Sequence, residues 1–315
     1  MPTFNSFAEY VQSHIREYFP PEQKADMNIS LEKVLKGNGQ QKVALLISTG
    51  EDPTQAVFYL EDLYQYFIHG MDVQTILRSI AAQYQYADRP QLDVSRITDF
   101  SYMKDKIGYR IMNAEMNGRL LEDHLWEPVC NLAKAYQLMH TDQTGSVRTL
   151  LPAHILKVWD ISREELDAIA AANMKKKYPP ALYSLDEMLL GEDGPVNLMG
   201  EEDPGFRTGL FCLTDVNGVA GASVVLYPGV LEQVQRMLGD DLVVIPSSVE
   251  EVLILPKSSA MPDRVLGNMV REVNRTMDRK LVLSDRAYAF TKEKPYLHEI
   301  PGSLVRRWER RKDER

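Results

Sequence analysis

Cysteine is scarce in this sequence, with only Cys130 and Cys212 among 315 residues. Secreted domains held by disulfides need several cysteine pairs, so this scarcity excludes a disulfide framework and favours a reducing cytosol. No segment approaches the ~18 consecutive apolar residues that cross a bilayer. Residues 1–5 also lack the basic and apolar regions of a secretory signal. We therefore expect a cytoplasmic protein without a membrane span.

Motifs for the common cofactors and metals are missing as well. Gly37 and Gly39 lack the third glycine of a dinucleotide-binding fingerprint, and no G-x-x-x-x-G-K-[ST] loop is present. The six histidines include no i, i+4 pair, and no C-x-x-C or H-E-x-x-H spacing occurs. Both cysteines stand in apolar runs and are expected to be buried structural thiols. The sequence therefore predicts no cofactor and no metal site.

Charge argues against a nucleic-acid partner. Acidic residues outnumber basic ones by 45 to 36, a net charge of −9, and phosphate backbones repel such a chain unless it has a basic patch. The exception is a basic tail over 301–315, where 306–315 hold six basic and three acidic residues around Trp308. Trp308 is a candidate binding residue, although a solvated terminus commonly has the same composition.

Hydrophobic periodicity predicts alternating helices and strands in the first 178 residues. Thr3 and Ser162 are the expected N-caps of two of these helices, because their side chains can accept backbone N–H groups. The glycines of 36–40 suit a tight hairpin between two strands. The expected helices are 3–19, 61–69, 72–86, 152–159 and 162–176, and the expected strands are 27–35, 42–48, 106–112, 129–139 and 146–151.

Residues 181–205 hold seven acidic and no basic residues, so 179–205 is expected to be an acidic linker. Beyond it, Asn217-Gly218 predicts a hairpin between two strands, and Pro228 and Gly239 bound a helix. The expected strands are 210–214, 222–227, 242–245, 252–255 and a short one at 281–283, and the expected helices are 228–239 and 262–277. This order predicts a β-β-α-β-β-α module with helices on one face of an antiparallel sheet.

The expected fold class is therefore α+β with antiparallel sheets. The expected organisation is an N-terminal module over 1–178, the acidic linker over 179–205, a C-terminal module over 206–300 and the basic tail over 301–315. No internal repeat is strong enough to indicate a duplication.

Two polar clusters in the C-terminal module are weak catalytic candidates. Ser247 and Ser248 lie between two apolar strands, where they bind a ligand or simply satisfy the backbone of a turn. Asn274 stands one residue from an apolar helical stripe, with Asp285 beyond it. A half-buried asparagine needs a partner, so we favour a hydrogen bond from Asn274 to the following loop over a catalytic pair.

Aromatic residues are concentrated between residues 58 and 67. Tyr59, Tyr64 and Tyr66 are candidate binding residues, because tyrosine is enriched at protein contacts. Packing of a helix edge explains the same residues equally well, and the sequence does not separate the two interpretations.

Several strings are familiar together: 222–231 (ASVVLYPGVL), 245–252 (IPSSVEEV), 270–274 (VREVN) and 283–285 (LSD), with 59–64 and 159–166 in the first half. This combination resembles an uncharacterised domain-of-unknown-function family from anaerobic Gram-positive bacteria. The resemblance covers most of the chain and implies a bacterial cytoplasmic protein. The family has no established activity, so the resemblance assigns no catalytic residues.

The leading hypothesis is a non-enzymatic binding or regulatory protein that acts by contact with a protein partner or as a homo-oligomer. Its basis is the lack of a metal motif, a phosphate loop and a convincing nucleophile. The alternative is a hydrolase with its site in a cleft between the modules, around Ser247, Ser248, Asn274 and Asp285.

Overall fold

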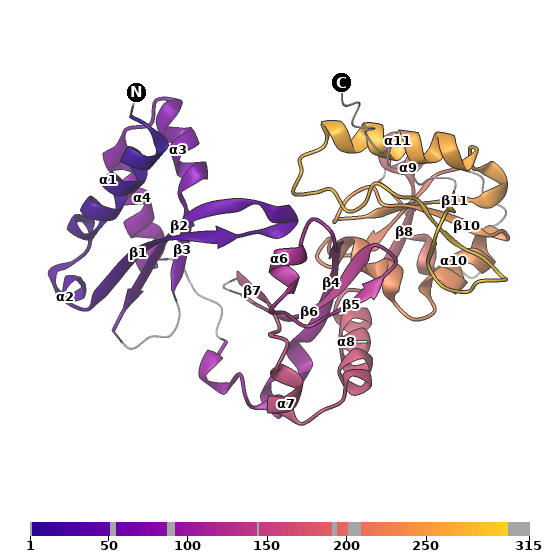
Figure 1. The fold of residues 1–315 in the computed structure, drawn as a ribbon, viewed down its shortest axis with the longest axis horizontal. Coiled ribbons are helices and arrows are strands. Elements are labelled where there is room, and N and C mark those ends of the chain that lie inside the picture. Colours follow the sequence, from indigo (N-terminus) through magenta and orange to yellow (C-terminus); the bar gives the residue numbers. More distant parts are fainter. Residues whose placement is uncertain are drawn as a thin grey trace, which may run out of the picture. The chain divides into compact units, whose positions relative to one another are not determined.

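The structure is a computed structural model that describes residues 2–50, 55–86, 92–143, 145–190, 194–200 and 209–301. The chain forms two compact units, each of which is built from two stretches of sequence (Figure 1). Unit 1 comprises Met1–Lys106 and Leu138–Thr149, and unit 2 comprises Ile107–Gln137 and Leu150–Arg315. The units divide the chain differently from the modules expected above, whose boundaries stay predictions.

Unit 1 contains a three-stranded antiparallel sheet of order β1-β2-β3 and the helices that bury its core. Thr3 caps the first helix by accepting the Ser6 N–H, as predicted. The turn between β1 and β2 has positive φ at Asn38 and Gly39. The helices are α1 (Phe4–His14), η1 (Ile15–Tyr18), α2 (Pro21–Lys24), η2 (Gly37–Gly39), α3 (Leu60–Ile68), α4 (Val73–Tyr86), η3 (Val94–Arg96), α5 (Phe100–Met103) and η4 (Lys104–Lys106), and the strands are β1 (Met27–Leu35), β2 (Gln41–Thr49) and β3 (Ala56–Tyr59).

The core of unit 1 follows the predicted apolar stripes. Val11 from α1, Leu45 and Ile47 from β2, and Leu77 and Ile80 from α4 are each fully buried in one cluster. At about 25 cal/mol per Å² of apolar surface, burial of each such side chain stabilises the fold by roughly 1.5–3 kcal/mol.

A four-stranded sheet has the order β4-β6-β5, with β7 paired to β6, and its first strand begins unit 2. Its apolar cluster joins Met112, Leu121, Ala133 and Ala135. Residues of β6 beyond Gln137, and those of β7 up to Thr149, belong to unit 1. The strands are β4 (Ile107–Asn113), β5 (Trp126–Val129), β6 (Leu132–Asp142) and β7 (Gly145–Leu150), and the helices are α6 (Gly118–Leu121), α7 (Ile155–Trp159) and α8 (Arg163–Lys177), the last capped by Ser162.

The second sheet of unit 2 has six antiparallel strands in the order β13-β12-β10-β11-β9-β8. Leu266 and Val270 of α11 pack against Val243 and Ile245 of β10. The strands are β8 (Pro180–Ser184), β9 (Phe211–Asp215), β10 (Leu242–Ile245), β11 (Val252–Pro256), β12 (Tyr288–Phe290) and β13 (His298–Glu299), and the helices are α9 (Leu185–Leu190), η5 (Leu198–Gly200), η6 (Gly221–Leu226), α10 (Val230–Leu238), η7 (Lys257–Ser259) and α11 (Asp263–Thr276).

The expected fold class, α+β with antiparallel sheets, is confirmed. One addition concerns the faces of the six-stranded sheet. The alternate residues Leu242 and Val244 of β10 point away from α11 and are buried too, so both faces of this strand are covered. The described helices include none that is long and apolar enough to cross a membrane.

The predicted strand at 222–227 is wrong, because these residues lie in the 3₁₀ helix η6 and the tyrosine after it. The buried carboxylate of Asp215 accepts the backbone N–H groups of Val219 at 2.9 Å, Ala220 at 2.7 Å and Gly221 at 2.8 Å. These bonds close the chain into a compact turn where an Asn-Gly hairpin was expected. The order is therefore not β-β-α-β-β-α at this point.

Two further expectations are corrected. Residues 281–283 form no strand, although Val282 and Leu283 are buried. Residues 180–190, inside the expected linker, fold as β8 and α9, and β8 pairs with β9 along its length. The acidic composition of this segment hid a strand at the edge of a sheet, where one side of the chain faces solvent.

A candidate binding groove held by a polar network

The two candidate serines bond within their own loop. Ser247 Oγ donates to Glu251 Oε1 at 3.2 Å, and Ser248 Oγ accepts the Glu250 N–H at 3.0 Å. The Cys212 thiol donates to the second carboxylate oxygen of Glu251 at 3.2 Å. Burial, together with this bond, raises the pKa of Cys212 to about 12, so the thiol stays protonated at neutral pH. The turn interpretation explains both serines.

Asn274 and Asp285 are brought together. Asn274 Nδ2 donates to Asp285 Oδ1 at 2.7 Å and to the Ser284 carbonyl oxygen at 2.9 Å, which ties α11 to the following loop. The predicted hydrogen bond from Asn274 to this loop is confirmed. A catalytic role for these two residues or for the serines stays a prediction.

The aromatic candidates differ in environment. Tyr64 packs edge-on against Phe4 with ring centroids 5.5 Å apart, and its hydroxyl donates to the Pro2 carbonyl. The Nζ atom of Lys36 lies 4.2 Å from the centre of the Tyr59 ring. Tyr66 is 57% exposed. Of the three, Tyr66 therefore has the most surface free for a partner, and Trp308 lies outside the described residues.

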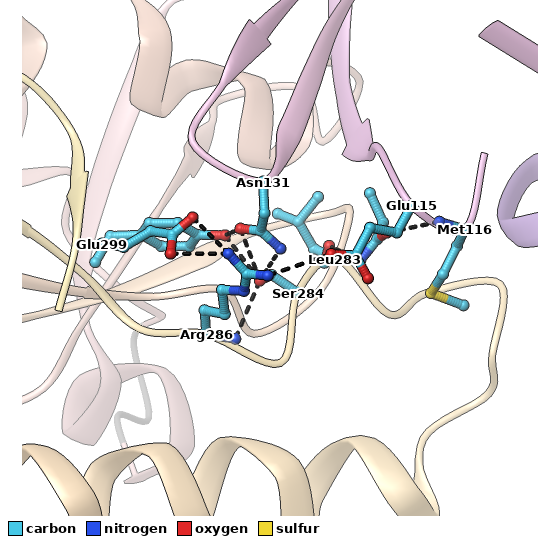
Figure 2. A network of polar contacts seen from close by, with 9 residues as sticks. Glu115, Met116, Asn131, Leu283, Ser284, Arg286 and Glu299 are labelled. Atoms are coloured by element: carbon cyan, nitrogen blue, oxygen red, sulfur yellow. Dashed lines mark hydrogen bonds and ion pairs between the residues drawn. The ribbon is translucent and has the colours of Figure 1, made fainter. Parts of the chain in front are cut away.

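A polar network in unit 2 is centred on Ser284, which is fully buried (Figure 2). Its hydroxyl lies within hydrogen-bond distance of Asn131 Nδ2 at 3.1 Å, of the Tyr288 hydroxyl at 2.7 Å and of the Arg286 backbone nitrogen at 3.1 Å. The Tyr288 hydroxyl also reaches Asn131 Oδ1. Asn131 lies in the turn between β5 and β6, so the network fixes this turn against the segment after α11.

Charged groups extend the network to β13 and to the end of β4. The Arg286 guanidinium contacts both carboxylate oxygens of Glu299 at 2.8 Å and one oxygen of Glu115 at 3.2 Å. Asn113 Nδ2 donates to the Leu283 carbonyl at 3.1 Å, and its Oδ1 accepts the Met116 N–H at 2.8 Å. Figure 2 shows Glu299, Arg286, Ser284 and Glu115 in one row.

Beside this network, the β5–β6 turn forms one wall of an open groove. Cys130, between Val129 and Asn131, is exposed and has a φ of 56°, which corrects the expectation of a buried thiol. Its Sγ donates to the Leu297 carbonyl at 3.3 Å. Val129 and Leu297 are two of the groove's lining residues. The network and the Cys130 contact therefore hold two walls of the groove in place.

The groove encloses about 280 Å³ and is lined mainly by apolar side chains. Pockets for whole small ligands are typically about 300–1,000 Å³ and largely closed, so this volume suits one or two side chains of a peptide better. Glu232 is its one charged lining residue and makes no ion pair with a described residue. The groove lining is Val129, Val225, Leu226, Tyr227, Pro228, Gly229, Leu231, Glu232, Phe290, Pro295, Tyr296 and Leu297.

Tyr296 is the most exposed aromatic of the groove, with 59% of its surface accessible. Its ring meets the His298 ring edge-on with centroids 5.7 Å apart, and His298 Nδ1 contacts the Tyr296 carbonyl oxygen at 3.0 Å. Tyr296 was not among the candidate residues predicted from the sequence. The available clue was Pro295-Tyr296 directly after a charged stretch, because an aromatic residue in a polar loop has no core to fill.

The part of the chain that the structure describes contains no cluster of three or more His, Cys, Asp or Glu side chains suited to a metal ion. The chain matches a family of unknown function, DUF5688, over residues 4–292, so it belongs to that family. No curated protein and no solved structure matches it.

Proposed function

We propose that this chain is a non-enzymatic binding protein of the bacterial cytoplasm that takes up a peptide segment of a protein partner in its groove. The observation that carries the proposal is the exposed ring of Tyr296 beside an open apolar hollow. Tyrosine is enriched at protein interfaces and among the residues that contribute most to binding.

The surroundings of the groove support the same proposal. Because the polar network fixes the β5–β6 turn and β13, little ordering remains to be done when a peptide binds, which favours affinity. Glu232 lines the groove and makes no ion pair with a described residue, so its carboxylate is available to a basic group of the partner. The expected peptide therefore has a large apolar anchor next to an arginine or lysine.

Selection of a phage-displayed peptide library on the full-length protein tests this proposal. We expect enriched peptides with an apolar residue beside a basic one. Tyr296→Ser should weaken their binding by about 10-fold or more, because loss of an interface aromatic typically costs above 1.4 kcal/mol. Tyr86→Ser, at a tyrosine that is 80% exposed, is the control and should leave affinity unchanged.

Three results would contradict the groove as the binding site. These are no enrichment, equal losses from Tyr296→Ser and Tyr86→Ser, or a loss from Tyr66→Ser in place of Tyr296→Ser. The last result would move the interface to the aromatic segment of unit 1.

The hydrolase alternative rests on the contact between Ser247 Oγ and the Glu251 carboxylate at 3.2 Å, since a carboxylate can accept a serine proton. A fluorophosphonate probe separates the two functions. Covalent labelling of Ser247 that is lost in Ser247→Ala supports the hydrolase, and an unlabelled protein supports the binding proposal.

A further inference from the structure

The described residues end at Pro301, only a few residues after the last residue that lines the groove. Tyr296 and Leu297 line it, and the Ile300 N–H donates to the Ala287 carbonyl at 3.0 Å, which anchors the chain just before Pro301. The four residues from Leu297 to Pro301 span at most about 14 Å. The seven residues from Pro301 to Trp308 reach about 23–25 Å when extended. The tail is therefore long enough to bring Trp308 back to the groove.

The chemistry of the tail matches what the groove is expected to take. Trp308 is a large apolar side chain with Arg307 before it and Arg310 two residues later. The net charge of 306–315 is +3. Because the whole chain has a net charge of −9, the remaining 305 residues have a net charge of −12. Opposite charges of this size favour contact between the tail and the folded part. Glu232 offers a carboxylate at the groove itself.

From reach, charge and apolar anchor together we infer that the tail of this chain, 302–315, occupies the groove through Trp308 and competes there with the partner peptide. This inference rests on the proposed function, because it assigns a regulator to the same groove. A tethered segment has an effective concentration in the millimolar range, so even weak intrinsic affinity blocks a dilute competitor.

The test uses a fluorescein-labelled synthetic peptide of residues 302–315 and full-length proteins, with binding followed by fluorescence anisotropy. In Trp308→Ala the chain's own anchor is removed. We expect this variant to bind the labelled peptide about 10-fold or more tightly than the unaltered protein does. Adding Tyr296→Ser to Trp308→Ala should abolish the gain, whereas adding Tyr86→Ser should preserve it. Circular dichroism shows that each variant is folded.

Equal affinity of the unaltered protein and of Trp308→Ala for the labelled peptide overturns the inference. An affinity that Tyr296→Ser leaves unchanged overturns it as well. The library-selected peptides separate the two failures. If they bind both proteins equally and still need Tyr296, the groove binds partners and only the tail's role is wrong. If they do not need Tyr296, the proposed function fails too.

A second copy of the chain is the remaining occupant to distinguish. Sedimentation of the unaltered protein should show a monomer at micromolar concentration. A dimer that becomes monomeric in Trp308→Ala would mean that the tail enters a neighbouring molecule, which overturns the intramolecular form of the inference.

Discussion

Arg286 Nη1 lies 2.8 Å from both carboxylate oxygens of Glu299, and both side chains are partly buried, with 32% and 22% of their surfaces exposed. Hydrogen bonds between two ionised groups are roughly twice as strong as those between neutral groups. In this chain they fasten β13, whose neighbour Leu297 lines the groove, to the loop after α11.

Arg286→Gln should therefore lower the free energy of unfolding by about 1–2 kcal/mol in urea titration, because the charge-assisted hydrogen bonds to Glu299 and Glu115 are lost. The control is Arg275→Gln, which breaks a pair with Glu272 whose side chains are 73% and 76% exposed. Exposed pairs contribute roughly 0–1 kcal/mol, so this variant should change stability by less than about 0.5 kcal/mol. Equal effects of the two variants would contradict a structural role for the Arg286 pair.

Ser284→Ala should cost about 2–3 kcal/mol of unfolding free energy. Its hydroxyl hydrogen-bonds with the side chains of Asn131 and Tyr288 in a fully buried position, and removal leaves these two groups short of a partner. Thermal or urea unfolding measures this loss of unfolding free energy. Ser13→Ala, on the exposed face of α1, is the matched change and should be close to neutral. A Ser284→Ala protein as stable as the Ser13→Ala protein would show that the network is dispensable.

Gly221→Ala should be among the most damaging single-methyl additions in the chain. At a φ of 54°, a Cβ would stand 2.6 Å from the Val249 carbonyl oxygen and 2.8 Å from Glu250 Cα, and both are backbone atoms. We expect a loss of about 3 kcal/mol or more, from the overlap together with the left-handed conformation. Gly239→Ala separates these causes, because Gly239 has a φ of 68° with nothing within 4 Å. That variant should lose only about 1 kcal/mol, the cost of the conformation alone.

Asp240 predicts a pH dependence of stability. Hydrogen bonds from Ser258, and then from the Asp241 N–H, lower the pKa of this carboxyl below its usual value of 3.8. A group whose pKa is lower in the folded state stabilises the fold above its unfolded pKa and loses that effect as pH falls through the folded pKa. Asp240→Asn should therefore destabilise by roughly 0.5–1 kcal/mol near pH 7.

The difference between Asp240→Asn and the unaltered protein should shrink as pH falls from about 4 through the lowered pKa of the folded state, below which the carboxyl is protonated in both states. Urea titrations at pH 7, 5 and 3 measure it. A constant difference across these three values would mean that Asp240 acts through packing or shape and not through its charge.

The elements that sequence predicted well are those whose own residues carry the pattern. The stripe through Ile76, Leu77 and Ile80 gives α4, and Thr3 and Ser162 cap their helices as expected. Two of the strands that were missed, β12 and β13, are short, and β12 depends on β10, which lies far earlier in the chain. The apolar run at 222–227 has the composition of a strand. The Asp215 carboxylate binds the backbone just before this run, and the run forms η6 instead of a strand. Local propensity was overridden there by one buried acceptor.

The candidate site was harder to predict than the fold. The hydrogen bond from Asn274 to the loop after α11 was predicted from the sequence, because this loop follows the helix directly. The groove joins Val129, Tyr227, Glu232 and Tyr296, which come from segments separated by many residues and carry no shared motif. Their proximity follows only from the sheet order, which brings β12 beside β10 and the 295–297 loop beside η6 and α10.

The discontinuous make-up of the two units sets an order for synthesis on the ribosome. Unit 1 has all its residues once Thr149 has been made, although 107–137 between its two stretches belong elsewhere. The β4 strand within that interval donates its Ile111 N–H to Ser223 Oγ, 112 residues later. At about 5–20 residues per second, β4 must wait roughly 6–20 s for this partner to emerge. Its buried apolar face is a surface for chaperones to protect during that interval.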